Sequence, residues 1–208
     1  GGLIAPLGFS EGLKAILLGH LIGGFILLLG GVVGTHSKLP AMMSTRISFG
    51  RYGSYIFSIL NVLQLVGWTA VMIISGARSA NELSIALFSM DSISVWAGIL
   101  GVMIALWILL GRGGFEKLNV VAVVLLFALT GVLSYVVLRE GTIFSIAPTH
   151  EMSFGAALEL SVIMPLSWLP LIADYTRFAK QKTSGLVGSF LGYFLGSSLM
   201  YTIGLAIA

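Results

Sequence analysis

The sequence predicts an all-α integral membrane protein, and its composition, hydropathy and pattern of apolar runs support this class. Of its 208 residues, 57% are hydrophobic and only 9% are charged, whereas soluble domains carry about 25% charged residues. The mean hydropathy is +1.04, and the long apolar runs lack the two-residue alternation of membrane strands. A soluble globular domain is therefore excluded, and a multi-pass protein of the inner or plasma membrane is expected.

The apolar runs define the expected elements. A helix needs about 20 apolar residues to cross a hydrocarbon core about 30 Å thick. We expect a half span at 1–9 and full spans at about 13–34, 54–77, 93–111, 119–138, 154–178 and 185–208. The chain starts without Met and stops inside an apolar run, so we expect residues 1–208 to be a partial transmembrane domain that further helices complete.

Basic residues alternate between the connections. The segments 35–53, 112–118 and 177–184 hold eight of the eleven Lys and Arg residues, and the opposite connections hold only Lys14, Arg78 and Arg139. The positive-inside rule places the first set in the cytoplasm. No basic run suggests a nucleic-acid partner, and the absence of cysteine excludes thiolate chemistry and cysteine metal sites.

Two glycine-rich segments share a GxxxGxF pattern. Gly19 and Gly23 carry it in the second segment, and Gly188 and Gly192 carry it in the seventh. Segments five positions apart cross the membrane in opposite directions, so the pattern predicts an inverted repeat. The alternative is a chance likeness between two helices whose small residues only allow close packing.

Prolines interrupt the segments that the repeat would relate. Pro165 and Pro170 lie five residues apart in the sixth segment, and Pro6 lies among glycines in the first. Each proline removes a backbone donor, so these helices should open. Paired breaks predict a substrate site near the membrane midplane, and the alternative is a proline kink without a ligand.

A polar face follows the third segment. Asn61, Gln64, Trp68 and Met72 recur at three- and four-residue steps and therefore share one side of a helix. Polar amides are costly in hydrocarbon, so this side should face inward. Trp68 offers a flat surface on which a planar ligand could stack. The alternative is that Trp68 fills space and the amides bind neighbouring helices.

Three further polar residues have structural explanations. Asp174 and Arg177 end the sixth segment, where a local ion pair is the alternative to a gating role. His20 lies among glycines and is expected to form a hydrogen bond across a helix interface, and a proton relay is the less favoured interpretation.

The GxSxG match at Gly8–Gly12 lacks the strand that a nucleophile elbow needs. No enzyme motif remains, and no cofactor is expected.

Several motifs together resemble the nucleobase:cation symporter-1 family. These are Gly2–Gly8, the loop Ser44–Gly50, Gly67-Trp68 and Ala173–Arg177. Within the family, the chain is most similar to CytX-type hydroxymethylpyrimidine transporters. The resemblance implies a LeuT-like fold of two inverted five-helix repeats, of which this chain holds the second half of helix one through helix seven.

The resemblance also implies how the protein would act. The family imports a small planar heterocycle by alternating access, which assigns ring stacking to Trp68 and further contacts to Ser167 and Trp168 in the broken helix around Pro165. Met72 replaces a polar residue that some members use. Na⁺ or H⁺ would drive transport, and the family's cation site lies outside this chain, so no metal site is expected within it.

Two other functions fit the sequence. One is an amino-acid or other small-solute permease on the same scaffold. The other is a non-transporting or channel-like membrane subunit, although a channel would usually carry rings of charge along its pore. In each case the partners would be the lipid bilayer and the remaining helices of the full-length protein.

Overall fold

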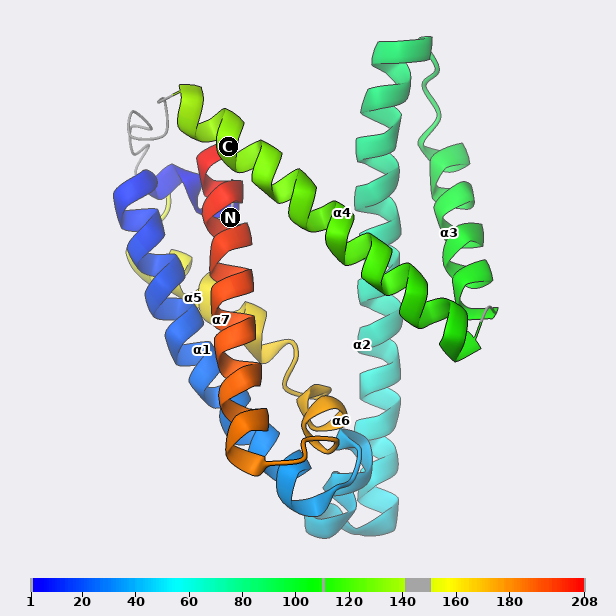
Figure 1. The fold of residues 1–208 in the computed structure, drawn as a ribbon, viewed down its shortest axis with the longest axis vertical. Helices are drawn as coiled ribbons and strands as arrows, with labels where there is room; N and C mark the ends of the chain where they lie inside the picture. The colour runs from blue at the N-terminus through cyan, green and yellow to red at the C-terminus, as the bar shows by residue number, and fades with distance from the viewer. Residues whose placement is uncertain (1, 110, 141–150, 208) are drawn as a thin grey trace. The chain divides into compact units, whose positions relative to one another are not determined.

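The computed structural model describes residues 2–109, 111–140 and 151–207, except the side chains of 111–118, 137, 138 and 140. Its elements, in order, are η1 (Gly2–Leu7), α1 (Phe9–Ser37), α2 (Ala41–Phe88), α3 (Ile93–Leu109), α4 (Gly111–Glu140), α5 (Phe154–Leu166), α6 (Ile172–Thr176) and α7 (Lys182–Ile207) (Figure 1). All regular structure in these ranges is helical. The chain divides into two compact units, Gly1–Phe57 with Ala128–Ala208 and Ser58–Phe127, and each is described by itself.

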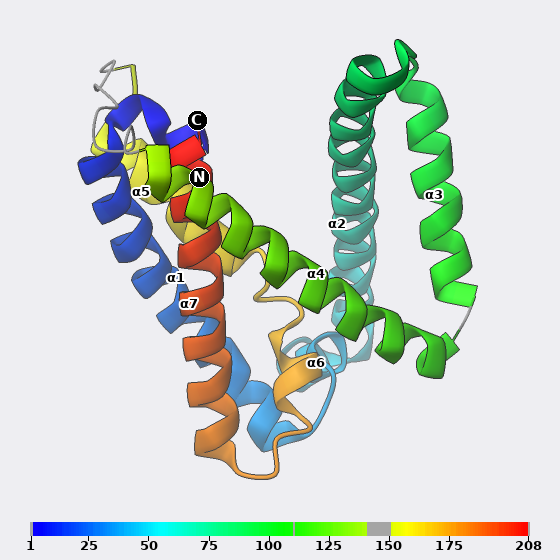
Figure 2. The same ribbon diagram turned by 45° about the horizontal axis from the view of Figure 1, so that its top comes forward.

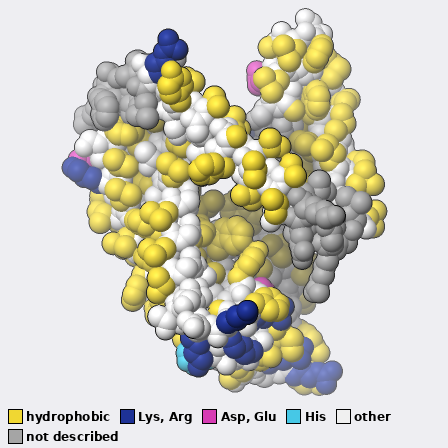
Figure 3. All heavy atoms as spheres, in the orientation of Figure 1, with side chains coloured by type: hydrophobic (Ala, Val, Ile, Leu, Met, Phe, Trp, Pro, Cys, Tyr) yellow, Lys and Arg dark blue, Asp and Glu magenta, His cyan; other side chains and the backbone are white. Residues whose placement is uncertain are grey.

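Long apolar helices dominate both units. Phe9–Ser37, Ala41–Phe88, Asn119–Val136 and Lys182–Ile207 are long and apolar enough to cross a membrane, and α3 and α5 are shorter apolar helices. A helix therefore lies in each predicted full span. Figure 3 shows hydrophobic side chains over much of the visible surface, as expected of a surface that meets lipid or further helices.

In the first unit, α1 lies between two partners that run in opposite directions. Along α1, Gly19, Gly23 and Gly34 meet Ser161, Pro165 and Ala173 in rising order, so α5 and α6 run parallel to α1. Gly12, Gly24 and Gly31 meet Leu205, Phe190 and Leu186 in falling order, so α7 runs antiparallel to α1. Figures 1 and 2 both show α7 beside α1. The two helices that carry the GxxxGxF pattern therefore run in opposite directions.

The glycines of α1 allow α5 to approach closely. A Cβ at Gly23 would lie 2.7 Å from the carbonyl oxygen of Val162 and 2.9 Å from Cγ of Pro165. A Cβ at Gly19 would overlap the side chain of Ser161. Where lipid gives no hydrophobic drive for association, this backbone approach supplies the van der Waals contact that holds helices together.

The sixth predicted span is broken, as its prolines predict. The helix α5 ends at Leu166, turns occupy 167–171, and α6 begins at Ile172. Pro170 has no N–H to donate, and in a continuous helix its ring would clash with the carbonyl of Leu166. The chain therefore leaves the helix between the two prolines, and the predicted break is confirmed.

The first predicted span is a short 3₁₀ helix, η1, followed by a sharp change of direction. Gly8 has φ 80° and ψ 163°, and α1 begins at the next residue. Positive φ is strained for residues with a Cβ, so glycine suits this position. Ile4 of η1 is buried with Ile16 of α1, Ala157 of α5 and Leu205 of α7. This cluster fixes η1 against the ends of three helices.

Two predicted loops are partly helical. Residues 41–49 form a helix that Gly50, at φ 66° and ψ −178°, separates from the rest of α2. The N–H of Ser44 donates to the carbonyl of Pro40 at 2.9 Å, which starts this helix directly after a proline. The predicted loop 112–118 also lies within α4. Both stretches were expected to be connections because they lie between the long apolar runs, but a polar stretch can continue as a helix outside the hydrocarbon.

The second unit contains the rest of α2, then α3 and the start of α4. A short connection joins α2 to α3, and Asn81 organises it. Its Nδ2 donates to Oδ1 of Asp91 at 2.8 Å, and its Oδ1 accepts from the N–H of Ser92 at 2.7 Å. A Cβ at Gly76 of α2 would lie 3.0 Å from Leu100 of α3. The two helices are therefore adjacent near this connection.

Candidate substrate site

The polar face of α2 borders an open hollow. Gln64, Gly67, Trp68 and Val71 line a space of about 390 Å³. Nothing lies within 4 Å of the position that a Cβ would take at Gly67, so the backbone leaves room beside the indole. The side chain of Trp68 is 39% exposed within this chain. A planar ring could therefore reach the indole face, and stacking of a substrate on Trp68 stays a prediction.

Asn61 and Met72 are on the same helical face but do not line this hollow. Asn61 is buried, and its Oδ1 accepts no hydrogen bond from the described residues. A buried acceptor without a donor costs free energy, so this oxygen is suited to receive one from a ligand or a further helix. Met72 is exposed and offers only a weakly accepting sulfur. Their contact with a substrate stays a prediction.

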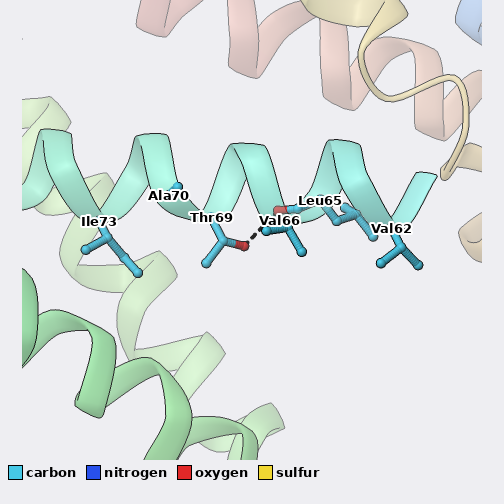
Figure 4. A pocket seen from close by; sticks show the side chains of 6 residues that line it. All are labelled: Val62, Leu65, Val66, Thr69, Ala70 and Ile73. Atoms are coloured by element: carbon cyan, nitrogen blue, oxygen red, sulfur yellow. Dashed lines mark hydrogen bonds between the residues drawn. The ribbon is translucent and has the colours of Figure 1, made fainter. Parts of the chain in front are cut away.

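A second hollow on α2 has a different character (Figure 4). Its volume is about 400 Å³, and its lining consists of Val62, Leu65, Val66, Thr69, Ala70 and Ile73. The hydroxyl of Thr69 already donates to the carbonyl of Leu65 at 2.8 Å. With its one hydroxyl proton used inside the helix, this side of α2 suits apolar neighbours. The amide and indole groups are therefore confined to the other side.

The break between α5 and α6 exposes backbone and an aromatic ring. The N–H groups of Trp168, Leu169 and Leu171 donate to carbonyls within the turn, at 2.9 to 3.1 Å. In the described chain, no group donates to the carbonyls of Leu169 and Pro170. The opened helix thus leaves these two backbone acceptors without a donor in the described chain.

Three predicted site residues lie at this break. Ser167 donates its hydroxyl to the carbonyl of Met164 at 2.7 Å, which spends its proton inside the turn. Trp168 is 40% exposed, with its ring centroid 6.5 Å from those of Tyr175 and Tyr193. Pro165 is buried against Gly23 of α1. Trp168 is therefore the member of this set best exposed for a ligand, and the substrate role of all three stays a prediction.

The predicted gating residues fall into different surroundings. The Nε of Arg177 donates to the backbone carbonyl of Asp174 at 3.3 Å, and its guanidinium lies 4.4 Å from the ring centroid of Phe178. No ion pair joins the two side chains in the described structure. Within that same structure, a Cβ at Gly188 or Gly192 would meet nothing within 4 Å. The glycine stripe of α1 is thus packed, and that of α7 is open.

Sequence reasoning missed two contacts that tie α1 to the α6 region. Thr176 donates its hydroxyl to the carbonyl of Gly31 at 2.9 Å, and Lys38 donates its Nζ to the carbonyl of Ala179 at 2.9 Å. Thr176 lies inside the Ala173–Arg177 motif, which was the available signal. The partners could not be found from the sequence, because 145 and 141 residues separate each pair.

The described residues bring together no three His, Asp or Glu side chains that could hold a metal ion. The α2 hollow presents an indole face and an amide, and the break between α5 and α6 presents backbone carbonyls and aromatic rings. Groups of these kinds can bind a small planar molecule through stacking and hydrogen bonds.

A family model described as a permease for cytosine/purines, uracil, thiamine and allantoin matches residues 1–208. The chain belongs to this permease family. The cytosine permease of Escherichia coli strain K12 is 26% identical to it over 210 residues, and that of Escherichia coli O157:H7 is 25% identical. Each alignment covers 99% of this chain and 49% of the relative. This chain thus spans about half the length of the curated relatives it matches.

A solved transporter shares the fold. It is Mhp1 of the nucleobase-cation-symport-1 family, in a closed conformation with bromovinylhydantoin bound. The TM-score is 0.79 at 20% identity, over 99% of this chain and 49% of Mhp1. The predicted all-α, LeuT-like transporter fold, present for about half its length, is therefore confirmed. The predicted family of nucleobase:cation symporters and the multi-pass membrane class are confirmed as well.

Proposed function

We propose that the full-length protein is a secondary active transporter that imports a pyrimidine-type heterocycle, either hydroxymethylpyrimidine or a cytosine-like nucleobase. Import is coupled to a cation and proceeds by alternating access in the cell membrane. Two observations support the proposal: the chain belongs to this permease family, and its sixth span opens at 167–171. The names of the cytosine permeases support a pyrimidine.

The opened span is the observation that carries the proposal. A break inside an apolar segment is tolerated only where protein or a cavity satisfies the backbone. Here the carbonyls of Leu169 and Pro170 receive no donor from the described chain. Exocyclic amino and ring N–H groups of a pyrimidine are suitable donors. The broken helix therefore gives a reason for recognising a polar ring edge.

The remaining roles follow the chemistry of each side chain. Trp68 stacks on the ring, and Gln64 and Asn61 line or support the cavity. Met72 contributes an apolar contact, which argues against a substrate that needs a strong hydrogen bond there. Ser167 and Trp168 contact the ring from the opened segment, whose geometry Pro165 fixes. Asp174, Arg177 and the glycine stripes serve packing and gating.

The cation and its site belong to the part of the protein outside this chain. Na⁺ or H⁺ supplies the gradient, and the remaining helices complete the binding site and the transport pathway. Among the residues described, no three His, Asp or Glu side chains lie close enough together to hold a metal ion.

Uptake by the full-length protein tests the function. Cells or proteoliposomes carrying it are given labelled cytosine or labelled hydroxymethylpyrimidine, with and without a sodium gradient and with and without a proton gradient. We expect one pyrimidine to accumulate above its external concentration, and collapse of one gradient should abolish that accumulation. Unlabelled pyrimidines should compete, and amino acids should not.

Each alternative function predicts a different result. Competition by amino acids would show a permease of another substrate class. Flux that equilibrates without accumulation would show a channel, and no flux of either pyrimidine would contradict the proposal. Membranes that contain the same amount of a Trp68→Ala variant serve as the matched control. They measure how much labelled pyrimidine binds to the lipid and to parts of the protein other than the proposed site.

A further inference from the structure

Residues 41–55 begin α2 and fold back on themselves, and we call this stretch the basic turn. Gly50, at φ 66°, changes the direction of the chain, and the Nε of Arg46 donates to Oγ of Ser54 at 3.3 Å. In a straight helix, residues eight apart are separated by about 12 Å along the axis. Ser54 is buried, and its own hydroxyl donates to the carbonyl of Arg51 at 2.8 Å. Side-chain hydrogen bonds therefore hold the turn in place.

Both arginines of the basic turn keep their outer nitrogens free. Arg51 donates its Nε to the hydroxyl oxygen of Tyr55 at 3.1 Å, as Arg46 does to Ser54. In the described structure, neither guanidinium forms another hydrogen bond or an ion pair. The Nη groups of arginine form the fork that binds phosphate oxygens bidentately. Because each guanidinium is held at Nε, its fork is oriented before a ligand binds.

The positive charge of the basic turn has no acidic counterpart in the sequence around it. Between Glu11 and Glu82 the chain contains no Asp or Glu. Asp174 of α6 forms no ion pair among the residues that the structure describes. Figure 3 shows Lys and Arg side chains gathered where α6 and the start of α2 lie in Figure 1. The positive-inside rule places this end in the cytoplasm, where the membrane leaflet is rich in anionic lipid.

Apolar and aromatic side chains are exposed beside these arginines. Ile47 is 70% exposed, Phe49 58% and Tyr52 80%. The apolar run of α2 starts at about residue 54, so the basic turn lies at the edge of the hydrocarbon. Basic residues next to apolar and aromatic ones are typical of segments at the headgroup level of a bilayer. A soluble anion would leave these apolar groups in water, whereas a lipid covers them.

We propose that the basic turn binds the headgroup phosphate of an anionic phospholipid in the cytoplasmic leaflet, through the Nη groups of Arg46 and Arg51. Ile47 and Tyr52 contact the glycerol and acyl region of the same lipid layer. In a zwitterionic lipid the headgroup cation compensates the phosphate, so the net charge of an anionic lipid favours it at this surface. The basic turn therefore selects lipids by headgroup charge when their acyl chains are equal.

Native mass spectrometry of the full-length protein in detergent tests the selection. Phosphatidylglycerol and phosphatidylcholine with the same acyl chains are added in equal amounts, and the ratio of the two in the first bound lipid is measured. One basic side chain near an anionic membrane surface corresponds to about a fivefold change in affinity. We expect Arg46→Gln and Arg51→Gln each to lower the preference for phosphatidylglycerol about fivefold. Arg78→Gln, which changes an exposed arginine of α2 outside the basic turn, is the matched control and should leave the preference unchanged.

A double lysine variant separates charge from structure. Lysine keeps the positive charge and attracts phosphate as a point charge, so Arg46→Lys with Arg51→Lys should retain a preference for phosphatidylglycerol that the double glutamine variant loses. Equal loss in both double variants would mean that the arginines only hold the turn, and would contradict the proposal. Size-exclusion chromatography of each variant checks that it folds. The same preference in wild type, Arg46→Gln and Arg51→Gln would also overturn the proposal.

Two soluble competitors distinguish a lipid from other anionic ligands. Inorganic phosphate, added at the concentration of the lipid, should not displace phosphatidylglycerol, because it offers nothing to the apolar side chains. Displacement would show a site for a soluble anion and would contradict the proposal. Binding of polyglutamate by a wild-type protein without a preference for phosphatidylglycerol would show a surface for an acidic protein instead, and would overturn it. None of these results depends on pyrimidine transport, so the proposed function is tested separately.

Discussion

Pro165, in the last turn of α5, packs against Gly23 of α1, where an added Cβ would lie 2.9 Å from the proline Cγ. The residue that begins the break is thus held by the bare face of its neighbour. Gly19 provides the same close approach one turn earlier, against Ser161. The break and the glycine stripe are therefore two parts of one packing arrangement.

Gly23→Ala should destabilise the full-length protein. The new methyl group would lie 2.7 Å from the carbonyl oxygen of Val162, and backbone cannot move aside as a side chain can. Overpacking of this kind costs about 1–3 kcal/mol. Thermal denaturation in detergent, followed by the loss of monodisperse protein, should show a lower midpoint.

Gly188→Ala is the matched control, because a Cβ there meets nothing within 4 Å in the described structure. It should be neutral or stabilising by up to about 1 kcal/mol, since alanine favours helix over glycine. Equal midpoints for Gly23→Ala and wild type would mean that the two helices are not in close contact.

Thr176→Val tests the attachment of α6 to α1. The hydroxyl is buried and donates to the carbonyl of Gly31 at 2.9 Å. Valine keeps the shape but cannot donate, so a loss of about 0.5–1.5 kcal/mol is expected. Hydrogen exchange at the amides of 172–176 should accelerate. In Thr202→Val, where the lost bond lies within α7 at 2.7 Å, exchange in α6 should be unchanged, and acceleration in both variants would contradict the assignment.

Asn81→Ala should loosen the connection between α2 and α3. It removes the contacts with Asp91 and with the N–H of Ser92, and leaves a backbone donor without its acceptor. A cost of about 1–3 kcal/mol is expected, seen as faster protease cleavage near 89–92. Ser79→Ala removes an exposed hydroxyl that bonds only within α2 and should cleave at the wild-type rate. Identical cleavage of Asn81→Ala would show that the side chain does not hold the connection.

The sequence contained the local signals of this fold but not the long-range partners. Pro165 and Pro170 predicted the break because each removes a donor wherever it stands. Gly19 and Gly23 predicted close packing, yet nothing in the sequence showed that the partner is α5. The contact of His20 with Ser197 spans 177 residues, and no local pattern encodes it.

Some local structure was also missed. Residues 41–49 were expected to belong to a loop because they lie between two long apolar runs, although they form a helix that Gly50 ends. The end of an apolar run predicts where the chain leaves the hydrocarbon and not where its helix ends. The candidate site was predicted best where chemistry is local, as in the shared face of Gln64 and Trp68, which line one hollow.

Equilibrium binding of labelled cytosine to the full-length protein and to Trp68→Ala tests the central claim most directly, with Trp96→Ala of α3 as the control. Stacking of a base on an aromatic ring contributes about 1–3 kcal/mol, so Trp68→Ala should bind about five- to 150-fold more weakly at an unchanged level in the membrane. Trp96→Ala should bind as the wild-type protein does. Unchanged affinity in Trp68→Ala would contradict the account.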